Sequence, residues 1–241
     1  MEAYKQMKIA YIAETSLTNK SAYTHHVLKM CDAFSKKGKL ILIIPELKNY
    51  PGLAKIRTNF LLNSKRKFKI IQILGFKSSN FIYRLFFSLK TAYKLKNYDA
   101  DLIITRSILS SLFLSLFKTY HYLEIHNELR GLTRFLMINL NNINSNYIRK
   151  IIFISNSLKK KFRKIKQKKI LILHDAVNIN NFPKKKNKLN IKNLTYMGSF
   201  HQGKGVELII ELAKKFQHLN FHLYGAPLKK KYEFTNNLKI Y

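Results

Sequence analysis

Short apolar runs alternate with helical patterns along most of the chain, and this alternation restricts the fold more than any other feature of the sequence. The candidate strands are KIAYIA at 8–13, LILIIP at 40–45, FKIIQIL at 68–74, DLIIT at 101–105, YHYLEIH at 120–126, KIIFIS at 150–155 and KILIL at 169–173. Helical patterns separate them at 23–37, 52–64, 80–96 and 156–166, and Gly38 is expected to end the first helix. Continuous apolar strands alternating with helices predict an α/β fold, a doubly wound parallel sheet covered on both faces.

A polar stretch, PKKKNKLNIKN at 183–193, interrupts this series and is typical of a linker. A second α/β series follows it, with LTYM at 194–197, a helix, NFHLYG at 220–225, a short Lys-rich helix and LKIY at 238–241. We therefore predict an N-terminal domain over 1–182, a linker over 183–193 and a C-terminal domain over 194–241. The last is expected to be incomplete, because a doubly wound domain usually needs about 100 residues.

The formal net charge of +33 favours an anionic partner. Only eight of the 45 basic residues are Arg, whereas base-reading and bidentate phosphate sites favour Arg. Three readings stay open at this point: a solvated Lys-rich surface, an anionic membrane surface and a nucleic acid. The longest apolar stretch, SILSSLFLSLF at 107–117, is about half the length of a membrane span. With Cys31 as the only cysteine and no signal-peptide core, we expect a cytoplasmic protein, peripheral at most to the inner face of a membrane.

The stretch YMGSFHQGKGVELIIELAKKF at 196–216 reads as a strand end, a glycine turn and a helix N-terminus. Backbone N–H groups at such a terminus, together with the charge of Lys204, favour an anion. A tight turn whose glycines only relieve backbone strain fits the pattern equally well. The spacing is neither G-x-G-x-x-G nor a Walker A loop. The sequence shows no paired hydrolase carboxylates, serine elbow or metal-ligand cluster, so no metal is predicted.

Several segments, taken in order, resemble GT-B glycosyltransferases of the retaining group called family 4. Residues 198–207 resemble the family segment G-S-x-x-x-G-K-G-[VI]-[ED], and HYLEIHNE at 121–128 resembles its E-x-H segment. Weaker likenesses are KIAYIA at 8–13 with the helix after it, IIFISNSLKKKF at 151–162, LHDAVNINNF at 173–182 and FHLYG at 221–225. Their order and spacing cover nearly the whole chain.

The resemblance implies two Rossmann-like domains, with a nucleotide-sugar donor on the second and a glycan or lipid-linked acceptor on the first. It implies a retaining mechanism without a protein nucleophile, and no cofactor besides the donor substrate. The donor pyrophosphate would lie on Gly198, Ser199, Gly203, Lys204 and Gly205, and Ser199 stands where the family often has Arg. His126 matches the family histidine near the donor sugar, and we predict that it is catalytic.

Other positions are expected to be ordinary. His25 and His26 lie in the first helix, near where acceptors would enter, and we expect them to be surface or half-buried residues. The preceding loop, 15–23, lacks the glycines common in the family, which argues against a close approach of its backbone to a phosphate. Cys31 is expected to be buried and inert.

The family's E-x7-E segment would lie beyond residue 241, so we expect a truncated or split transferase. The second domain should then expose a sheet edge and an apolar face, and a complementing chain would supply the remainder. Two alternatives stay open: a basic nucleic-acid-binding protein, and a non-catalytic remnant or subunit of a split transferase.

Overall fold

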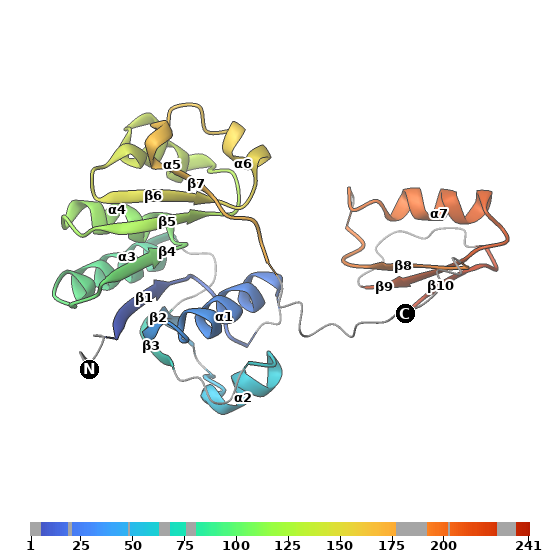
Figure 1. Cartoon of the computed structure of the whole chain (residues 1–241), viewed down its shortest axis with the longest axis horizontal. Helices are drawn as coiled ribbons and strands as arrows, with labels where there is room; N and C mark the ends of the chain where they lie inside the picture. The colour runs from blue at the N-terminus through green and yellow to red at the C-terminus, as the bar shows by residue number, and fades with distance from the viewer. Residues whose placement is uncertain are drawn as a thin grey trace, which may run out of the picture. The chain divides into compact units, whose positions relative to one another are not determined.

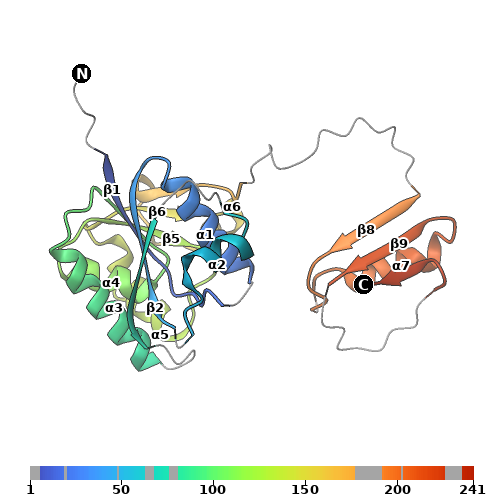
Figure 2. The same cartoon turned by 90° about the horizontal axis from the view of Figure 1, so that it is seen from below.

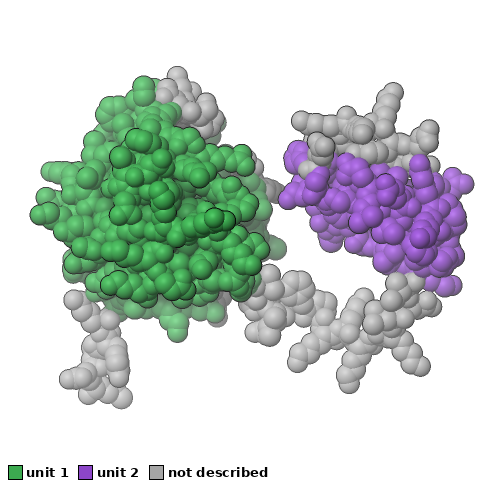
Figure 3. All heavy atoms as spheres, turned by 90° about the horizontal axis from the view of Figure 1, so that it is seen from above, with its two compact units in different colours: residues 1–176 green, residues 177–241 purple. Residues whose placement is uncertain are grey.

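A computed structural model describes residues 6–18, 21–47, 49–62, 68–75, 81–176, 192–201, 203–225 and 235–241. The chain forms two compact units, Met1–Ala176 and Val177–Tyr241, which Figure 3 shows in different colours. The predicted linker lies outside the described residues except for its last two positions. Each unit has its own sheet.

The first unit is built on a parallel sheet whose described strands run in the order β3-β2-β1-β4-β5-β6-β7 (Figure 1). The strands are β1 Met7–Ile12, β2 Gly38–Glu46, β3 Phe68–Gly75, β4 Leu102–Thr105, β5 His121–Ile125, β6 Ile148–Phe153 and β7 Ile170–Ile172. Every neighbouring pair is parallel. The predicted α/β class and its doubly wound parallel sheet are confirmed.

Helices cover both faces of this sheet, and side-chain alternation along the strands assigns the faces. The helical segments are α1 Ala22–Phe34, α2 Gly52–Asn59, α3 Phe81–Lys96, α4 Ile108–Leu116, α5 Gly131–Arg134, η1 Phe135–Asn139, η2 Asn142–Asn144, α6 Asn156–Lys160 and η3 Gln167–Lys169. Ile9 and Tyr11 of β1 pack with α1 and α2, whereas Ala10 and Ile12 pack with α3 and α4. The η1, η2 and α6 segments pack with β5 and β6 in a third cluster. Figure 2 shows the same layers from below.

Two local predictions were wrong. Helix α1 ends at Phe34, and Gly38 is the first residue of β2. A Cβ at Gly38 would lie 2.0 Å from the carbonyl oxygen of Met7, so the glycine serves the close approach of β1 and β2. The helix predicted over 156–166 ends at Lys160, because like charges four residues apart, such as Lys160 and Lys164, oppose a continuous helix there.

The second unit is a smaller parallel sheet with one described helix against it. Strands β8 Asn193–Met197, β9 Asn220–Tyr224 and β10 Leu238–Ile240 lie in the order β10-β9-β8, and α7 spans Val206–Lys215. The buried residues of its core are Phe200, Val206, Ile210, Ala213, Phe221, Leu223 and Leu238. On the opposite face Met197 is 79% exposed, and the rings of Tyr224 and Tyr241 stack 4.5 Å apart. The Lys-rich helix predicted before β10 lies outside the described residues.

Within the described residues, no helix has the combination of length and hydropathy that a membrane span requires.

Candidate functional site

The strand order of the first unit creates a switch point between β1 and β4. The chain passes from β1 toward β2 on one side, whereas β4 leads to β5 on the other. In doubly wound sheets, ligands bind beyond the carboxyl ends of the strands at such a point. Residues that directly follow β1, β4 and β5 are therefore the first candidates for a site.

His126 follows β5 directly and is oriented by Glu124 of the same strand. Its Nε2 contacts the Oε1 atom of Glu124, whose Oε2 accepts a hydrogen bond of 3.0 Å from the Tyr11 hydroxyl. Because a carboxylate only accepts, the Nε2–H of His126 is the donor, and in the neutral ring Nδ1 carries the lone pair. No described residue donates to Nδ1, and the side chain remains 15% exposed. In its neutral form, His126 can therefore accept a hydrogen bond from a bound hydroxyl.

Tyr11, Glu124 and His126 form a cluster, and Arg106, which follows β4, supplies its positive charge. Its side chain is 3% exposed, its Nε lies 3.8 Å from Glu124 Oε1, and its guanidinium carbon lies 4.2 Å above the ring of Tyr23. A guanidinium NH donates to His26 Nδ1 at 2.8 Å. The buried charges of Arg106 and Glu124 thus compensate each other.

His26, in α1, also belongs to this cluster. Since Nδ1 accepts from Arg106, its Nε2–H points to Asp175, 3.1 Å away, and its ring meets that of His126 edge-on at 5.0 Å. Asp175 follows β7, so the cluster includes residues from both ends of the described chain of the first unit. Sequence reasoning placed His26 among ordinary residues, whereas the structure places it beside His126.

The protonation equilibria of the cluster follow from burial and these charges. Burial and the charge of Arg106 lower the pKa of His26, which favours the neutral ring. Burial alone would raise the pKa of Glu124, but the His126 hydrogen bond and Arg106 together lower it. Burial raises the pKa of Tyr23 to about 12. At neutral pH the cluster therefore holds a charged Glu124, a charged Arg106 and a neutral His26.

His26, Glu124 and His126 also offer three ligand atoms within 4.8 Å of one another, as a metal site would. Arg106 works against a cation here, because its guanidinium already bonds His26 and faces the same oxygen of Glu124. A divalent ion would add positive charge beside a buried guanidinium. The arrangement fits a hydrogen-bonding site better than a metal centre.

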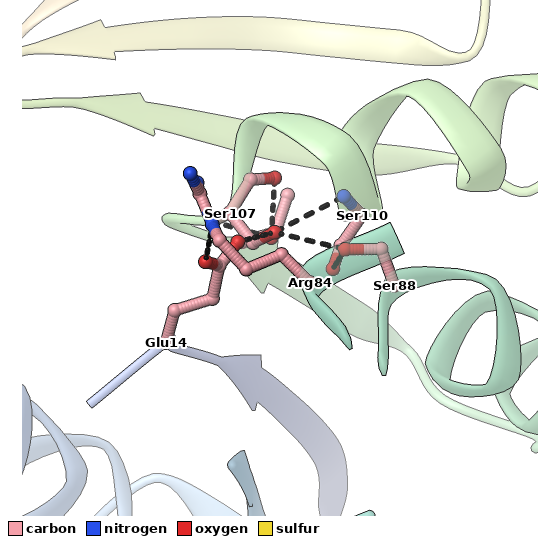
Figure 4. A network of polar contacts seen from close by, with 6 residues as sticks. Glu14, Arg84, Ser88, Ser107 and Ser110 are labelled. Atoms are coloured by element: carbon pink, nitrogen blue, oxygen red, sulfur yellow. Dashed lines mark hydrogen bonds and ion pairs between the residues drawn. The ribbon is translucent and has the colours of Figure 1, made fainter. Parts of the chain in front are cut away.

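A second polar network fixes the strand ends at the switch point. Glu14, which follows β1 closely, accepts hydrogen bonds from Ser107 Oγ at 2.5 Å and from Arg84 Nε at 2.6 Å (Figure 4). The Ser107 oxygen also caps α4 by accepting from the Ser110 N–H at 3.1 Å. Ser110 in turn donates to Ser88 of α3. This network ties α3 and α4 to the end of β1, next to Arg106.

The second unit holds the glycine turn that connects β8 to α7. Gly203 and Gly205 have φ of +82° and +84°, which L side chains rarely adopt, and Gly205 is the N-cap of α7. Gly205 has no side chain that could cap this helix, and the positive end of the helix dipole lies at the turn. Lys204, between the two glycines, is exposed. The turn thus has the groups that an anion requires.

Gly198 and Ser199 lie at the start of the same turn. Gly198 donates to the Tyr224 carbonyl at 3.0 Å, and the Tyr196 hydroxyl donates to the Ser199 carbonyl at 2.8 Å. A Cβ on Gly225 would lie 1.8 Å from the Gly198 carbonyl oxygen. The ends of β8 and β9 can therefore lie this close together only because residue 225 is a glycine. The five residues predicted to bind the nucleotide-sugar donor therefore lie in one turn.

Sequence reasoning predicted His126 and the turn as site residues, which stays a prediction, and missed Glu124, Arg106, Tyr11 and Asp175 as parts of the cluster. Glu124 was visible only as the first letter of the E-x-H segment. The others are separated in sequence by up to about 160 residues and meet through the parallel sheet.

No protein-family model matches the chain, and no curated protein matches it either. Solved structures do share its fold. The lipopolysaccharide outer core galactosyltransferase WaaB is 15% identical, with a TM-score of 0.58 over 91% of this chain and 61% of WaaB. Anabaena HepE, in complex with UDP-glucose, is 10% identical, with a TM-score of 0.63 over 98% of this chain and 68% of HepE. TarM is 12% identical, with a TM-score of 0.69 over 100% of this chain and 77% of TarM.

At these identities the likeness concerns the fold. A UDP-N-acetylglucosamine 2-epimerase from Rickettsia bellii shares it too, at 12% identity and a TM-score of 0.54, over 98% of this chain and 69% of the epimerase. This chain spans 61% of the length of WaaB. Its two parallel-sheet units have the α/β architecture of the GT-B glycosyltransferases.

Proposed function

We propose that the protein transfers a sugar from a nucleotide-sugar donor to a glycan or glycolipid acceptor at the cell surface. One observation carries the proposal: Lys204, between two glycines of positive φ, lies at the N-terminus of α7. A diphosphate matches this site because it can accept the helix N–H groups and pair with the lysine. A UDP-glucose complex among the proteins that share the fold, and a galactosyltransferase beside it, support the same donor class.

The first unit would act on the sugar. His126 is held by Glu124 with its Nδ1 available, so it would accept a hydrogen bond from a donor-sugar or acceptor hydroxyl. The turn would meanwhile stabilise the charge that develops on the departing diphosphate. This division needs no protein nucleophile and is the basis on which we propose a retaining mechanism. Ser199 would contribute hydrogen bonds without charge.

Nucleotide binding is the first test. UDP or GDP should raise the melting temperature of the full chain, because a ligand held 100-fold above its Kd contributes about 2.7 kcal/mol. Lys204→Ala should abolish the shift, whereas Lys214→Ala, an exposed lysine at the other end of α7, should retain it. A folded sample that shows no nucleotide-dependent shift would rule out the donor site.

Product analysis then distinguishes between the activities of enzymes that share this fold. With a sugar nucleotide and membrane-extracted acceptors, transfer should release UDP or GDP and label the acceptor. Acceptor-independent change of the sugar itself would indicate an epimerase instead. If nucleotide binds but no transfer occurs until a second chain is added, the protein is one part of a split transferase or a non-catalytic subunit of one.

The high net charge favours two further kinds of partner, an anionic membrane and a nucleic acid. A peripheral position at an anionic membrane in the cytoplasm is part of our proposal. A nucleic acid is the alternative, and it predicts binding whose logarithm falls steeply with the logarithm of salt concentration. Negligible binding at moderate salt would remove this alternative.

A further inference from the structure

The first unit has a cavity of about 410 Å³ at the edge of its sheet that lies opposite the His126 cluster. Asp101, Tyr120 and Arg149, which lie at or just before the starts of β4, β5 and β6, line it together with the ends of α3 and α4. Because these strands are parallel, this is the amino edge of the sheet, whereas His126 follows the carboxyl end of β5. Tyr120 and His126 are about 20 Å apart, at 3.3 Å per residue. We call the cavity the amino-edge pocket, and its volume is typical of sites for small molecules.

Arg149 is the cation that this pocket offers to a ligand. Its guanidinium carbon lies 5.0 Å from the centre of the Tyr120 ring, and none of the described residues accepts a hydrogen bond from it. A guanidinium presents its donors as a planar fork that matches two oxygens of a carboxylate or a phosphate. Only eight of the 45 basic residues are Arg, so the general surplus of lysine does not explain an arginine here. The pocket therefore favours an anionic group.

Lys118 adds a second positive charge from the end of α4. Its φ is +56°, and it occupies the position after the C-cap, where glycine is usual. Its N–H donates to the Ser115 carbonyl at 3.1 Å, and the Thr119 N–H donates to the Leu114 carbonyl at 2.8 Å, which closes the helix. A lysine here also offsets the negative end of the helix dipole, whereas Arg149, at the start of a strand, has no such role.

The remaining groups of the pocket suit the hydroxyl groups and the ring of a sugar. Asp101 accepts a hydrogen bond from the Lys8 N–H through Oδ2, at 2.7 Å, and no described residue bonds its Oδ1. The hydroxyls of Tyr98 and Tyr120 bond no described residue either, and each can both donate and accept. The ring of Phe117 offers apolar surface to the C–H face of a sugar. A carboxylate among these groups would repel a plain anion but accepts hydrogen bonds from hydroxyls.

We propose that the amino-edge pocket binds an anionic carbohydrate, a sugar that carries a carboxylate or a phosphate. Arg149 and Lys118 pair with the anionic group, and Asp101 and the tyrosines bond the hydroxyls. A nucleobase would require a free aromatic face, but Arg149 and Tyr147 already pack against the Tyr120 ring, with the two tyrosine ring centres 5.4 Å apart. The ligand has two conceivable sources, a soluble sugar phosphate and an acidic sugar within a glycan chain.

Isothermal titration calorimetry of the full chain tests the proposal without a sugar donor. The probes are glucose 6-phosphate and a hyaluronan tetrasaccharide, and at least one should bind with a Kd below about 1 mM. Glucose and inorganic phosphate, which each have half of the required chemistry, should bind at least about tenfold more weakly. Tighter binding of the tetrasaccharide identifies a glycan chain as the source, and tighter binding of glucose 6-phosphate identifies a soluble sugar phosphate. Inorganic phosphate bound as tightly as both saccharides would overturn the carbohydrate assignment, and so would no binding of either.

Two arginine variants test whether the probe lies in the pocket. Arg149→Gln should weaken binding by about 10- to 100-fold, the loss expected for hydrogen bonds to a charged group. Arg163→Gln removes the same charge from an exposed position of the first unit outside the pocket and should change binding by less than about twofold. Equal losses in the two variants would mean that net charge alone attracts the probe, and the proposal would be overturned.

Two glycine variants separate binding from folding. Glycine adopts a positive φ without strain, so Lys118→Gly should not lower the urea midpoint, while it should weaken binding by about fivefold. Leu61→Gly makes the same backbone change at the end of α2, where φ is +49°, and should leave binding unchanged. If both glycine variants bind the probe as tightly as the wild type, Lys118 does not contact the anion and the proposed site is wrong.

Lys204→Ala distinguishes the pocket from the turn proposed for the nucleotide-sugar donor. This variant should retain the binding of the probe, because Lys204 belongs to the second unit. If Lys204→Ala loses binding and Arg149→Gln does not, the probe lies on the donor turn, and the pocket proposal fails while the transferase proposal stands. Uridine 5′-monophosphate bound by Lys204→Ala more tightly than both saccharides, and lost in Arg149→Gln, would assign the pocket to a nucleotide instead.

Discussion

Among single residues, Glu124 has the most demanding position, because it neutralises a buried guanidinium and orients His126 at once. Its side chain is 7% exposed, and that of Arg106 3%. Removing one member of a buried pair leaves the other charge uncompensated.

Glu124→Gln should therefore lower the free energy of unfolding of the first unit by about 3–5 kcal/mol. Urea unfolding followed by circular dichroism measures the loss. Glu128→Gln is the control, since the pair of Glu128 and Lys161 is exposed and surface pairs contribute about 0–1 kcal/mol. Equal losses in the two variants would mean that Glu124 does not compensate Arg106.

His121 gives the first unit a dependence on pH. It is fully buried, with Nδ1 donating to the Thr119 carbonyl and Nε2 bonded to Ser111, and burial lowers its pKa to about 4. The unfolded chain binds the proton first, near pH 6.5, so stability is greatest above that value and falls as the pH drops toward 4.

Between about pH 7 and pH 5, His121 should account for a loss of about 2 kcal/mol in the free energy of unfolding. His121→Gln should reduce the pH dependence by that amount, even if it costs stability at neutral pH, and the exposed His201→Gln should leave it unchanged. Urea titrations at several pH values give the slopes. A slope that is the same in wild type and His121→Gln would contradict the assignment.

At this scale the sequence allowed only part of the site to be predicted. His126 was predicted through the E-x-H segment, a local pattern. Arg106 and His26 come from β4 and α1, and only the parallel sheet brings them to Glu124. No local pattern contains that information, because ordinary Arg and His residues look the same in isolation.

At the scale of elements, three helices of the first unit begin in the same way. Ser21, Ser107 and Ser155 are the N-caps of α1, α4 and α6, and each accepts from the backbone N–H three residues later at 3.1 Å. These caps place the helix starts at the carboxyl edge of the sheet, where the His126 cluster lies.

Ser155→Ala should lower the free energy of unfolding by about 1 kcal/mol, since α6 is short and has one side-chain cap. Ser157→Ala removes a hydroxyl from an exposed position in the same helix and should change it by less than about 0.5 kcal/mol. Chemical denaturation of the two variants in parallel decides the matter, and equal effects would show that the cap contributes nothing.

Strands were easier to predict than helix ends. Buried parallel strands read as continuous apolar runs, so each predicted strand of the first unit overlaps an observed one. Helix ends depend on neighbours: Gly38 looked like a cap but is dictated by Met7 on β1, and α6 stops within a Lys run whose apolar spacing still looks helical.

For the whole molecule, the cores determine how the chain unfolds. The three clusters of buried residues described in Met1–Ala176 contain no residue of the second unit, and the cluster described in Val177–Tyr241 contains none of the first. The second core consists of seven described buried residues under one helix. Units of this size are marginal, because a domain of about 60 residues buries only about 60% of its chain surface.

Urea should therefore unfold the protein in two steps, with the second unit unfolding at the lower concentration and with the smaller m-value, since m scales with the surface exposed. Hydrogen exchange assigns the steps, because amides of β8 and β9 should lose protection before those of β1 and β4. A piece covering residues 1–176 should reproduce the upper transition alone. The cores would have to be coupled if all amides lost protection together, or if residues 1–176 unfolded at a much lower urea concentration than within the full chain.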